Sequence, residues 1–123
     1  MRYTHLYVDP NGDSRFEDAA LTMETDTSAP GVTEFVSGDQ AVERLRFLQL
    51  PPGWFQEQRP AHNRRWLLVL SGVLDVEASD GEVRRFGPGR VLLVEDTSGN
   101  GHRGRVVGGP AEIVIAPLAA TSA

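Results

Sequence analysis

One histidine stands where a protein could use it for chemistry. The stretch LLVEDTSGNGHRGR, residues 92–105, runs from an apolar segment into a loop that places His102 among Gly99, Gly101 and Gly104. Histidine donates or accepts a proton near neutral pH, and it also binds metals. Glycine lets the backbone take a positive φ or approach a ligand closely, so the loop favours a position at the rim of a cavity. The alternative is a histidine that hydrogen-bonds only within its own loop.

Two short polar side chains in this loop, Asp96 and Thr97, belong to types that often bind nearby backbone amides. We therefore expect both residues to hold the shape of the loop rather than to act on a ligand. Glu95, directly before them, is open to either role.

Arginine supplies all of the positive charge. The chain has 12 basic residues, and every one is arginine. Without lysine, Schiff-base and pyridoxal phosphate chemistry anchored on a lysine is excluded, and without cysteine so are thiolate nucleophiles and zinc–thiolate sites. A genome that prefers arginine codons would produce the same composition. The functional alternative is a site for a carboxylate or phosphate, which guanidinium groups bind well; its candidates are Arg46, Arg59, Arg64 and Arg65.

Length and charge narrow the class of protein. A chain of 123 residues predicts a single domain over residues 1–123. The net charge of −5 disfavours a general role in nucleic-acid binding. No stretch approaches the roughly 20 apolar residues of a membrane span, and the N-terminal residues lack the apolar core of a signal peptide. We expect a cytoplasmic protein that binds a small molecule and neither nucleic acid nor membranes.

The elements that position the candidate residues are expected to be short β-strands. No segment sustains the 3.6-residue apolar period of a helix, whereas β-type runs recur between turns rich in glycine and proline. This pattern predicts an all-β sandwich or barrel, with an additional N-terminal hairpin that lies across the barrel or reaches a partner subunit. The expected strands span residues 2–8, 16–24, 32–37, 41–50, 64–70, 73–78, 82–86, 90–95, 103–107 and 111–116.

The order of these motifs resembles the small bacterial cupins. The likeness is carried by PPGW and by RRWLLVLSGVLDVEASDGEVRRFGPGRVLLVEDTSGNGH, with its VLSG bend, SDGE hairpin, FGPG corner and final histidine. The EDT loop is similar to that of one cupin subgroup. The resemblance implies a double-stranded β-helix, a jelly-roll barrel, with its core at about residues 41–116 and the strands of residues 1–40 packed on the barrel or at a dimer interface. It does not imply one activity, because cupins include oxygenases, isomerases, cyclases, lyases and non-catalytic proteins.

The resemblance also implies where metal ligands would lie. Counting back from Gly72, the three ligand positions of the first cupin motif fall on Arg59, Ala61 and Arg65. Only the histidine of the second motif has a counterpart, His102. Arginine at a ligand position repels a cation, so we expect neither a tightly bound metal nor another cofactor. One metal alternative stays open, an irregular triad of His62, Glu57 and His102.

Strand alternation predicts which side chains enter the barrel. Arg65 is expected inside it, with Leu67 and Val69. A buried arginine needs a carboxylate or a ligand anion, which leaves two alternatives. One is a clamp for a carboxylate, enolate or phosphate, and the other is an internal salt bridge to Glu57, Asp75 or Glu95. The side chains expected to face outward, towards a second layer or another subunit, are Trp66, Leu68 and Leu70.

Two further segments could supply cavity walls. Residues 53–58, GWFQEQ, alternate between a face with Trp54 and Gln56 and a face with Phe55 and Glu57, and either face could line the cavity. Residues 43–50, ERLRFLQL, place Arg46 on the same face as Leu48 and Leu50. If that face points inward, Arg46 lies near the site.

Together these residues favour a metal-independent lyase, isomerase or cyclase that acts on an anionic or carbonyl-containing metabolite. His102 would transfer the proton with help from Glu57 or His62, and Arg65 would stabilise the negative charge. The expected ligand contacts are Arg65, Arg46, Trp54, Gln56 and Leu67. The alternatives are a non-catalytic cupin that binds a small ligand and a metal-dependent cupin oxygenase or isomerase with atypical ligands. We expect a homodimer formed through the N-terminal strands and the outward row of Trp66.

Overall fold

The computed structural model describes residues 1–120, and these form an all-β chain. The described residues contain no helix, and so none that could cross a membrane. The twelve strands are β1 (Arg2–Val8), β2 (Ser14–Ala20), β3 (Met23–Asp26), β4 (Glu34–Ser37), β5 (Arg46–Leu50), β6 (Phe55–Arg59), β7 (Arg65–Ser71), β8 (Leu74–Ala78), β9 (Val83–Phe86), β10 (Val91–Val94), β11 (His102–Val106) and β12 (Ala111–Pro117).

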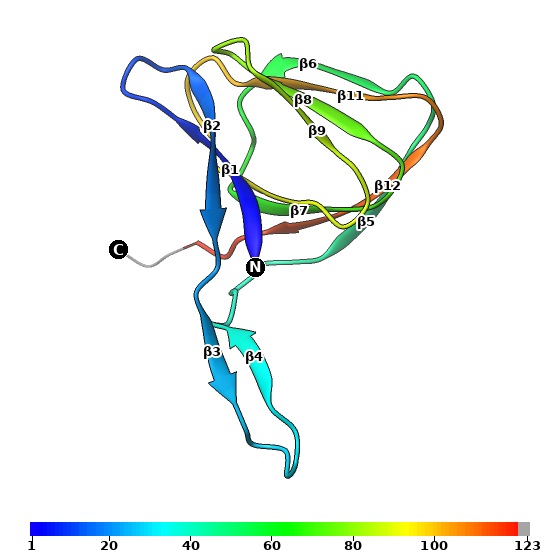
Figure 1. The fold of residues 1–123 in the computed structure, drawn as a ribbon. Helices are drawn as coiled ribbons and strands as arrows, with labels where there is room; N and C mark the ends of the chain where they lie inside the picture. Colours follow the sequence, from blue (N-terminus) through cyan, green and yellow to red (C-terminus); the bar gives the residue numbers. More distant parts are fainter. Residues whose placement is uncertain (121–123) are drawn as a thin grey trace.

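The strands from β5 to β12 form a barrel of two facing sheets (Figure 1). One sheet contains the order β10-β7-β12-β5, and the other has the order β6-β11-β8-β9. Successive strands alternate between the sheets except at the β8–β9 hairpin, so the chain winds around the barrel as a double-sheet jelly roll. This is the architecture of cupins, and it confirms the predicted fold.

The N-terminal hairpin extends the first sheet. β1 pairs with β10 in parallel, with Leu6 opposite Val94, and β2 pairs with β1 on its other side. The sheet therefore has six strands, and the predicted hairpin lies on the barrel. This pairing also brings the β1–β2 turn next to the loop that follows β10, where Asn100 N–H donates to the carbonyl of Gly12.

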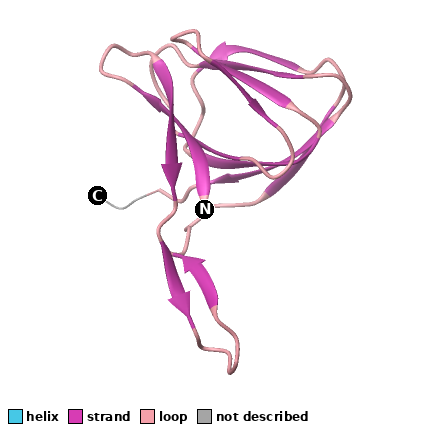
Figure 2. Cartoon of the chain, viewed as in Figure 1, coloured by secondary structure: helices cyan, strands magenta, loops and turns pink. Residues whose placement is uncertain are grey.

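Three strands differ from the prediction. The strand expected at residues 41–50 begins only at Arg46. The run expected at residues 16–24 is broken after Ala20, and β3 pairs only with β4 in a two-stranded sheet. This hairpin projects away from the barrel (Figure 2), and we call residues 22–39 the arm. The expected strands do not include β6, because its sequence, FQEQR, contains a single apolar residue.

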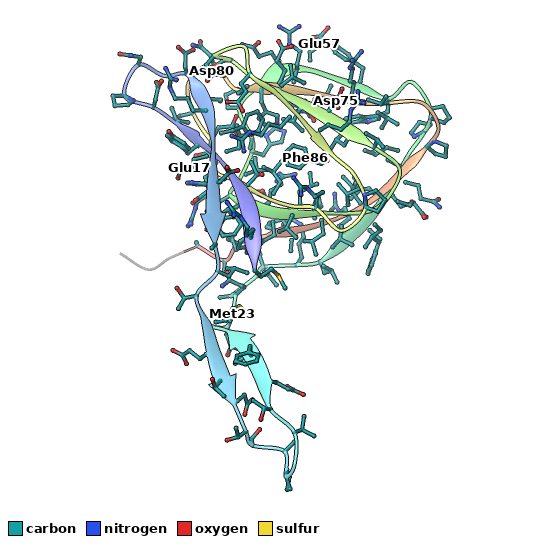
Figure 3. The ribbon with its side chains drawn as sticks, in the orientation of Figure 1. Glu17, Met23, Glu57, Asp75, Asp80 and Phe86 are labelled. Carbon is teal, nitrogen blue, oxygen red and sulfur yellow. The ribbon has the colours of Figure 1, made fainter. Side chains whose placement is uncertain are left out.

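Alternating side chains fill the space between the sheets. The fully buried ones include Leu6, Val69, Phe86 and Leu92, and Figure 3 shows Phe86 within the barrel. The predicted direction of β7 is confirmed, since Val69 belongs to this core while Trp66 lies on the outer face.

The outer row of β7 is more covered than the sequence predicts. Trp66 is only 8% exposed, because Tyr3 packs edge-on against its ring and Gln40 accepts a hydrogen bond from its indole N–H. Further along the same face, Leu70 is 53% exposed. The chain therefore covers the tryptophan itself and leaves the far end of the row open to solvent.

Candidate active site

A cavity of about 130 Å³ lies inside the barrel, between the two sheets. Its floor is apolar and comes from several strands of both sheets. These floor residues include Leu48, Leu50, Leu67, Leu74, Val76, Leu92, Val94, Ile113 and Ile115. The polar side chains in its wall are Gln56, Arg59, His62, Arg65 and His102. The cavity therefore combines an apolar body with polar groups of mainly positive or neutral character.

His102 is oriented by a buried carboxylate. Its Nδ1 lies 2.6 Å from Oδ2 of Asp96, whose side chain is fully buried. With the carboxylate of Asp96 as the acceptor, Nδ1 carries the hydrogen of this bond. The second ring nitrogen, Nε2, has no hydrogen-bond partner among residues 1–120 and stays available to a ligand in the cavity that His102 lines.

Asp96 is held in turn by the N-terminal hairpin. The hydroxyl of Ser14, at the start of β2, donates to the same Oδ2 over 2.8 Å, and Ser14 is also fully buried. The backbone N–H of Ser14 donates to the hydroxyl of Ser79, 2.7 Å away. The other carboxylate oxygen, Oδ1, is buried without a partner among the described residues. The hairpin therefore completes the support of the histidine.

Asp96 supports the loop as expected, but through partners other than the expected loop amides. Its side chain binds the imidazole and the serine hydroxyl, and its backbone carbonyl accepts from the N–H of Ala61. No sequence signal distinguishes it from a residue that shapes the loop, because Asp96 and His102 are six residues apart across a turn. Ser14 is separated from Asp96 by 82 residues, and the sequence gives no indication that they meet.

Glycines allow the loop to reach this position. Gly101 has a φ of +77°, and a Cβ there would fall 2.0 Å from the carbonyl carbon of Arg59. Gly99 has a φ of +76° and would clash with Gly12 in the same way. The prediction of positive φ is confirmed at both positions, and the close approach is to neighbouring backbone. Only glycine lets the loop pack so closely beside His102.

Arg65 enters the cavity without a carboxylate. Its Nε donates to the side-chain oxygen of Asn63 over 2.9 Å, and no Asp or Glu of residues 1–120 forms a salt bridge with it. Burial lowers the pKa of Arg65, and the positive charges of Arg44, Arg46 and Arg59 lower it further. Folding therefore disfavours the charged form of Arg65, and an anion bound beside it would compensate for this cost.

The carboxylates considered as partners for Arg65 are engaged elsewhere. Asp75 pairs with Arg85 at 2.9 Å and with Arg105 at 3.5 Å. Glu95 pairs with His5 and Arg64. The alternative of an internal salt bridge to either residue is therefore wrong, and so is the pairing with Glu57.

Strand alternation explains why Glu57 is misplaced by the sequence prediction. Trp54 and Gln56 line the cavity, whereas Glu57 is exposed and points away from the barrel (Figure 3). The geometry therefore gives Glu57 no contact with His102. The choice between the two faces of this segment could not be made from its sequence.

The remaining predicted residues divide between the wall and the rim. Leu67 and His62 line the cavity, although His62 is otherwise exposed. Arg46 is on the inward face of β5 with Leu48 and Leu50, as one alternative predicted, but it is exposed and outside the wall. Its charge nevertheless acts on Arg65. Arg59 lies directly in the wall, opposite His102 in the β6–β11 pairing.

The residues present do not fit a cupin metal ion. All four positions that correspond to cupin ligands line this one cavity, but they are Arg59, Ala61, Arg65 and His102. A divalent metal needs three or four nitrogen and oxygen ligands, and two of these groups are cations. Within residues 1–120, no three His, Asp or Glu side chains gather as a metal site would require. The irregular triad with Glu57 and His62 is therefore not formed.

Comparisons with known proteins identify the fold only. No protein-family model matches the sequence, and no curated protein matches it significantly. Among solved structures, the chain is similar to a conserved protein of unknown function from Streptococcus pyogenes, with a TM-score of 0.50 and 12% identity over 63% of this chain and 65% of that one. The match thus spans slightly less than two thirds of the streptococcal protein.

Two further structures are similar to this chain. A protein from Neisseria meningitidis matches with a TM-score of 0.52 and 14% identity over 82% of this chain and 86% of that one. The Cnp3 cupin domain of Schizosaccharomyces pombe matches with a TM-score of 0.43 and 15% identity over 78% and 84% of the two chains. At such identities the likeness to the streptococcal and neisserial proteins concerns the fold alone, and the strand order identifies that fold as a cupin-type jelly roll.

Proposed function

We propose that the protein is a metal-independent enzyme of the lyase, isomerase or cyclase kind that moves a proton on a small anionic molecule. The observation that carries this proposal is the contact of His102 with the buried Asp96, in a cavity that also contains the unpaired Arg65. A histidine oriented by a carboxylate is a general base, and a fixed cation stabilises the oxyanion that proton removal creates.

The size and lining of the cavity limit the substrate. An engineered cavity of about 150 Å³ binds benzene, which has six non-hydrogen atoms, so a cavity of about 130 Å³ suits a ligand of about that size or smaller. Its carboxylate would lie against Arg65 and Arg59, and its apolar part against Leu67 and the aliphatic floor. Gln56 would hydrogen-bond a carbonyl or hydroxyl group. A short-chain or small-ring carboxylate with a second oxygen function satisfies all of these groups.

The proposed step begins at Nε2 of His102. This nitrogen accepts a proton from the carbon next to a carboxylate or carbonyl group, and the electron pair of the C–H bond moves onto the oxygen. Arg65 stabilises the resulting enolate, while Asp96 stabilises the imidazolium. The imidazolium then returns its proton to another carbon, which isomerises the substrate, or to a departing group, which completes an elimination.

Proton exchange tests this step before the full reaction is known. A panel of short carboxylates is first screened for compounds that raise the melting temperature, and each hit is then incubated with the protein in D₂O and followed by NMR. We expect deuterium to enter the carbon next to the carbonyl or carboxylate. His102→Ala should slow this exchange by roughly 10²–10⁴, the usual contribution of a general base, with the fold retained. Glu57→Gln is the control, because Glu57 is exposed and outside the cavity wall, and this variant should exchange at close to the wild-type rate.

A second candidate function is non-catalytic binding of the same kind of ligand. It is favoured by one observation: among the described cavity residues, His102 is the only acid–base group with an orienting partner. Carboxylates that bind through Arg65 but show no proton exchange in the wild-type protein would establish this function in place of the enzyme.

A further inference from the structure

The arginines at the mouth of the barrel have no carboxylate partners. Seven of the 12 arginines pair with a carboxylate, namely Arg15, Arg44, Arg64, Arg84, Arg85, Arg103 and Arg105. The five without such a partner among residues 1–120 are Arg2, Arg46, Arg59, Arg65 and Arg90. Carboxylates are not scarce, because the chain has 17, and within the described residues the four of the arm pair with no arginine. Three of the unpaired arginines, Arg46, Arg59 and Arg65, nevertheless gather at one end of the barrel.

Arg59 enters the cavity because β6 contains a bulge. Simple alternation from Gln56 would place Arg59 on the outward face, with Glu57. In the pairing with β11, Arg59 lies opposite His102 and Gln56 lies opposite Gly104, so β6 holds one more residue than β11 between these pairs. The extra residue reverses the alternation, and Arg59 lines the cavity. Bulges beside active sites often redirect a side chain in this way.

Arg46 continues an inward row of the other sheet. It is the first residue of β5, the edge strand, and lies opposite Ile115 of β12. Ile115 lies in turn opposite Leu67 of β7. Residues directly opposite one another share a face of the sheet, and both Ile115 and Leu67 line the cavity. Arg46 therefore stands at the rim, at the end of a row that leads out of the cavity.

One ligand carboxylate does not compensate the positive charge of this mouth. A carboxylate between Arg65 and Arg59 leaves Arg46 without a counter-charge, since the acidic residue near it in sequence, Glu43, already binds Arg44 at 2.9 Å. The charges of Arg44, Arg46 and Arg59 also act on Arg65 and lower its pKa. A second anionic group on the same ligand would offset this repulsion. The apolar floor cannot receive that group, because burial of an unpaired charge is costly, so the group must point towards the mouth.

We propose that the substrate is a short dicarboxylate, with one carboxylate against Arg65 and Arg59 and the second against Arg46 at the rim. Its methylene groups lie along Leu67 and Ile115. This inference rests on the proposed function for the position of the first carboxylate. It adds Arg46 as the residue that distinguishes a dicarboxylate from a monocarboxylate.

Matched ligand pairs test the second carboxylate. Titration calorimetry compares malonate, succinate and glutarate with their monoamides, which have nearly the same shape and one charge fewer. We expect at least one diacid to bind the wild-type protein about tenfold or more tightly than its monoamide, because a charge-assisted hydrogen bond is lost in the amide. If no diacid of the three binds more tightly than its monoamide, the proposal is overturned.

Substitution of Arg46 assigns the preference to one residue. Arg46→Met should lower the affinity for the diacid to that for the monoamide and leave the monoamide affinity unchanged, whereas Arg65→Met should weaken both. Arg46→Lys keeps the charge and should retain most of the preference. The matched control is Arg90→Met, because Arg90 is also unpaired among residues 1–120 but precedes β10, at the end of that strand opposite to the end that pairs with Arg65. It should bind both ligands as the wild type does.

The outcomes separate this proposal from the proposed function. Circular dichroism first confirms that each variant is folded. If Arg46→Met weakens both members of a pair equally, or neither, Arg46 does not bind the second carboxylate and the proposal is wrong, while proton exchange on a monocarboxylate would still support the enzyme. If the diacid preference depends on Arg46 but the bound diacid exchanges no proton in D₂O, the dicarboxylate site stands and the enzymatic function fails.

Discussion

The outer face of the four-stranded sheet provides counter-charges for its buried charged residue, whereas the interior of the barrel does not. On the outer face, Asp75 is nearly buried and is covered by two exposed arginines, Arg85 and Arg105. In the interior, Arg65 is half-buried, and the charges that act on it are other arginines. The first group is complete within the fold, whereas the second lacks its counter-charge.

The pKa values of Asp75 and Arg65 are both lowered, but the consequence for the charged form is opposite in an acid and in a base. The hydrogen bond from Arg85 lowers the pKa of Asp75, which means that folding favours its charged form. Burial and neighbouring arginines lower the pKa of Arg65, which means that folding disfavours its charged form. The charge of Asp75 therefore stabilises the fold, whereas the charge of Arg65 destabilises it. A cation in these surroundings at a cavity wall supports the proposed role of Arg65 in ligand binding.

Within the comparison of Arg65 with Asp75, the largest expected effect comes from Arg65→Met. Loss of the charge-assisted hydrogen bonds to a carboxylate should weaken its binding by about 10- to 100-fold. The melting temperature of the ligand-free protein should stay the same or rise, because an opposed charge is removed. Titration calorimetry with a short carboxylate found by thermal-shift screening, together with thermal denaturation, measures both quantities.

Arg64→Met is the matched control for this contrast. Arg64 is the neighbouring residue, but it is exposed and paired with Glu95. Its replacement should leave carboxylate binding unchanged. If Arg65→Met instead unfolds the protein while binding persists, Arg65 supports the fold and the comparison with Asp75 is wrong.

A smaller effect is expected from Asp75→Asn. Removing the charge should lower the free energy of unfolding by about 1–3 kcal/mol at pH 7 and leave carboxylate binding unchanged. Because the folded-state pKa of Asp75 lies below its ordinary value of 3.8, its stabilisation is complete above the unfolded-state pKa and is lost as pH falls through the folded-state value. Urea denaturation at pH 7 and at pH 3 should therefore show a smaller difference between wild type and variant at pH 3.

The control for Asp75 is Asp18→Asn. Asp18 contacts Arg84, but its side chain is 65% exposed, and exposed ion pairs contribute little. If Asp18→Asn lowers the free energy of unfolding as much as Asp75→Asn does, the buried carboxylate of Asp75 contributes no more to stability than an exposed one.

The sequence predicts the barrel and the direction of its strands better than it predicts the support of His102. The alternation of β7 places Arg65 and Leu67 in the cavity, since a period of two depends only on local geometry. Glu57 is misplaced because each face of the segment 53–58 carries one aromatic residue, Trp54 or Phe55, beside polar ones, so that the pattern does not distinguish inside from outside. The break after Ala20 is missed because neither glycine nor proline marks it. The contact of Ser14 with Asp96 depends on parallel pairing of β1 with β10, which no local pattern specifies.

Asp96 is intermediate between Asp75, which has charged partners, and Arg65, which lacks a counter-charge. Removing one of its partners gives the smallest predicted effect. It is a buried carboxylate like Asp75, but its partners are a neutral hydroxyl and an imidazole. Ser14→Ala removes one of these partners and should lower the free energy of unfolding by about 1 kcal/mol. The carboxylate remains, so His102 should keep its hydrogen on Nδ1, as ¹⁵N NMR of the imidazole would show. Ser79→Ala, one step further from Asp96 in the same network, should cost a similar amount and also leave the imidazole unchanged.

Asp96→Asn separates support of the fold from orientation of the histidine. An amide offers a weaker acceptor than a carboxylate, so the preference of His102 for the Nδ1–H tautomer should fall in this variant and in neither serine variant. If Ser14→Ala shifts the tautomer as much as Asp96→Asn does, the serine hydroxyl orients the imidazole as strongly as the carboxylate does. If none of the three substitutions shifts it, the contact with Asp96 does not control the imidazole, and the role of His102 as an oriented base loses its physical support.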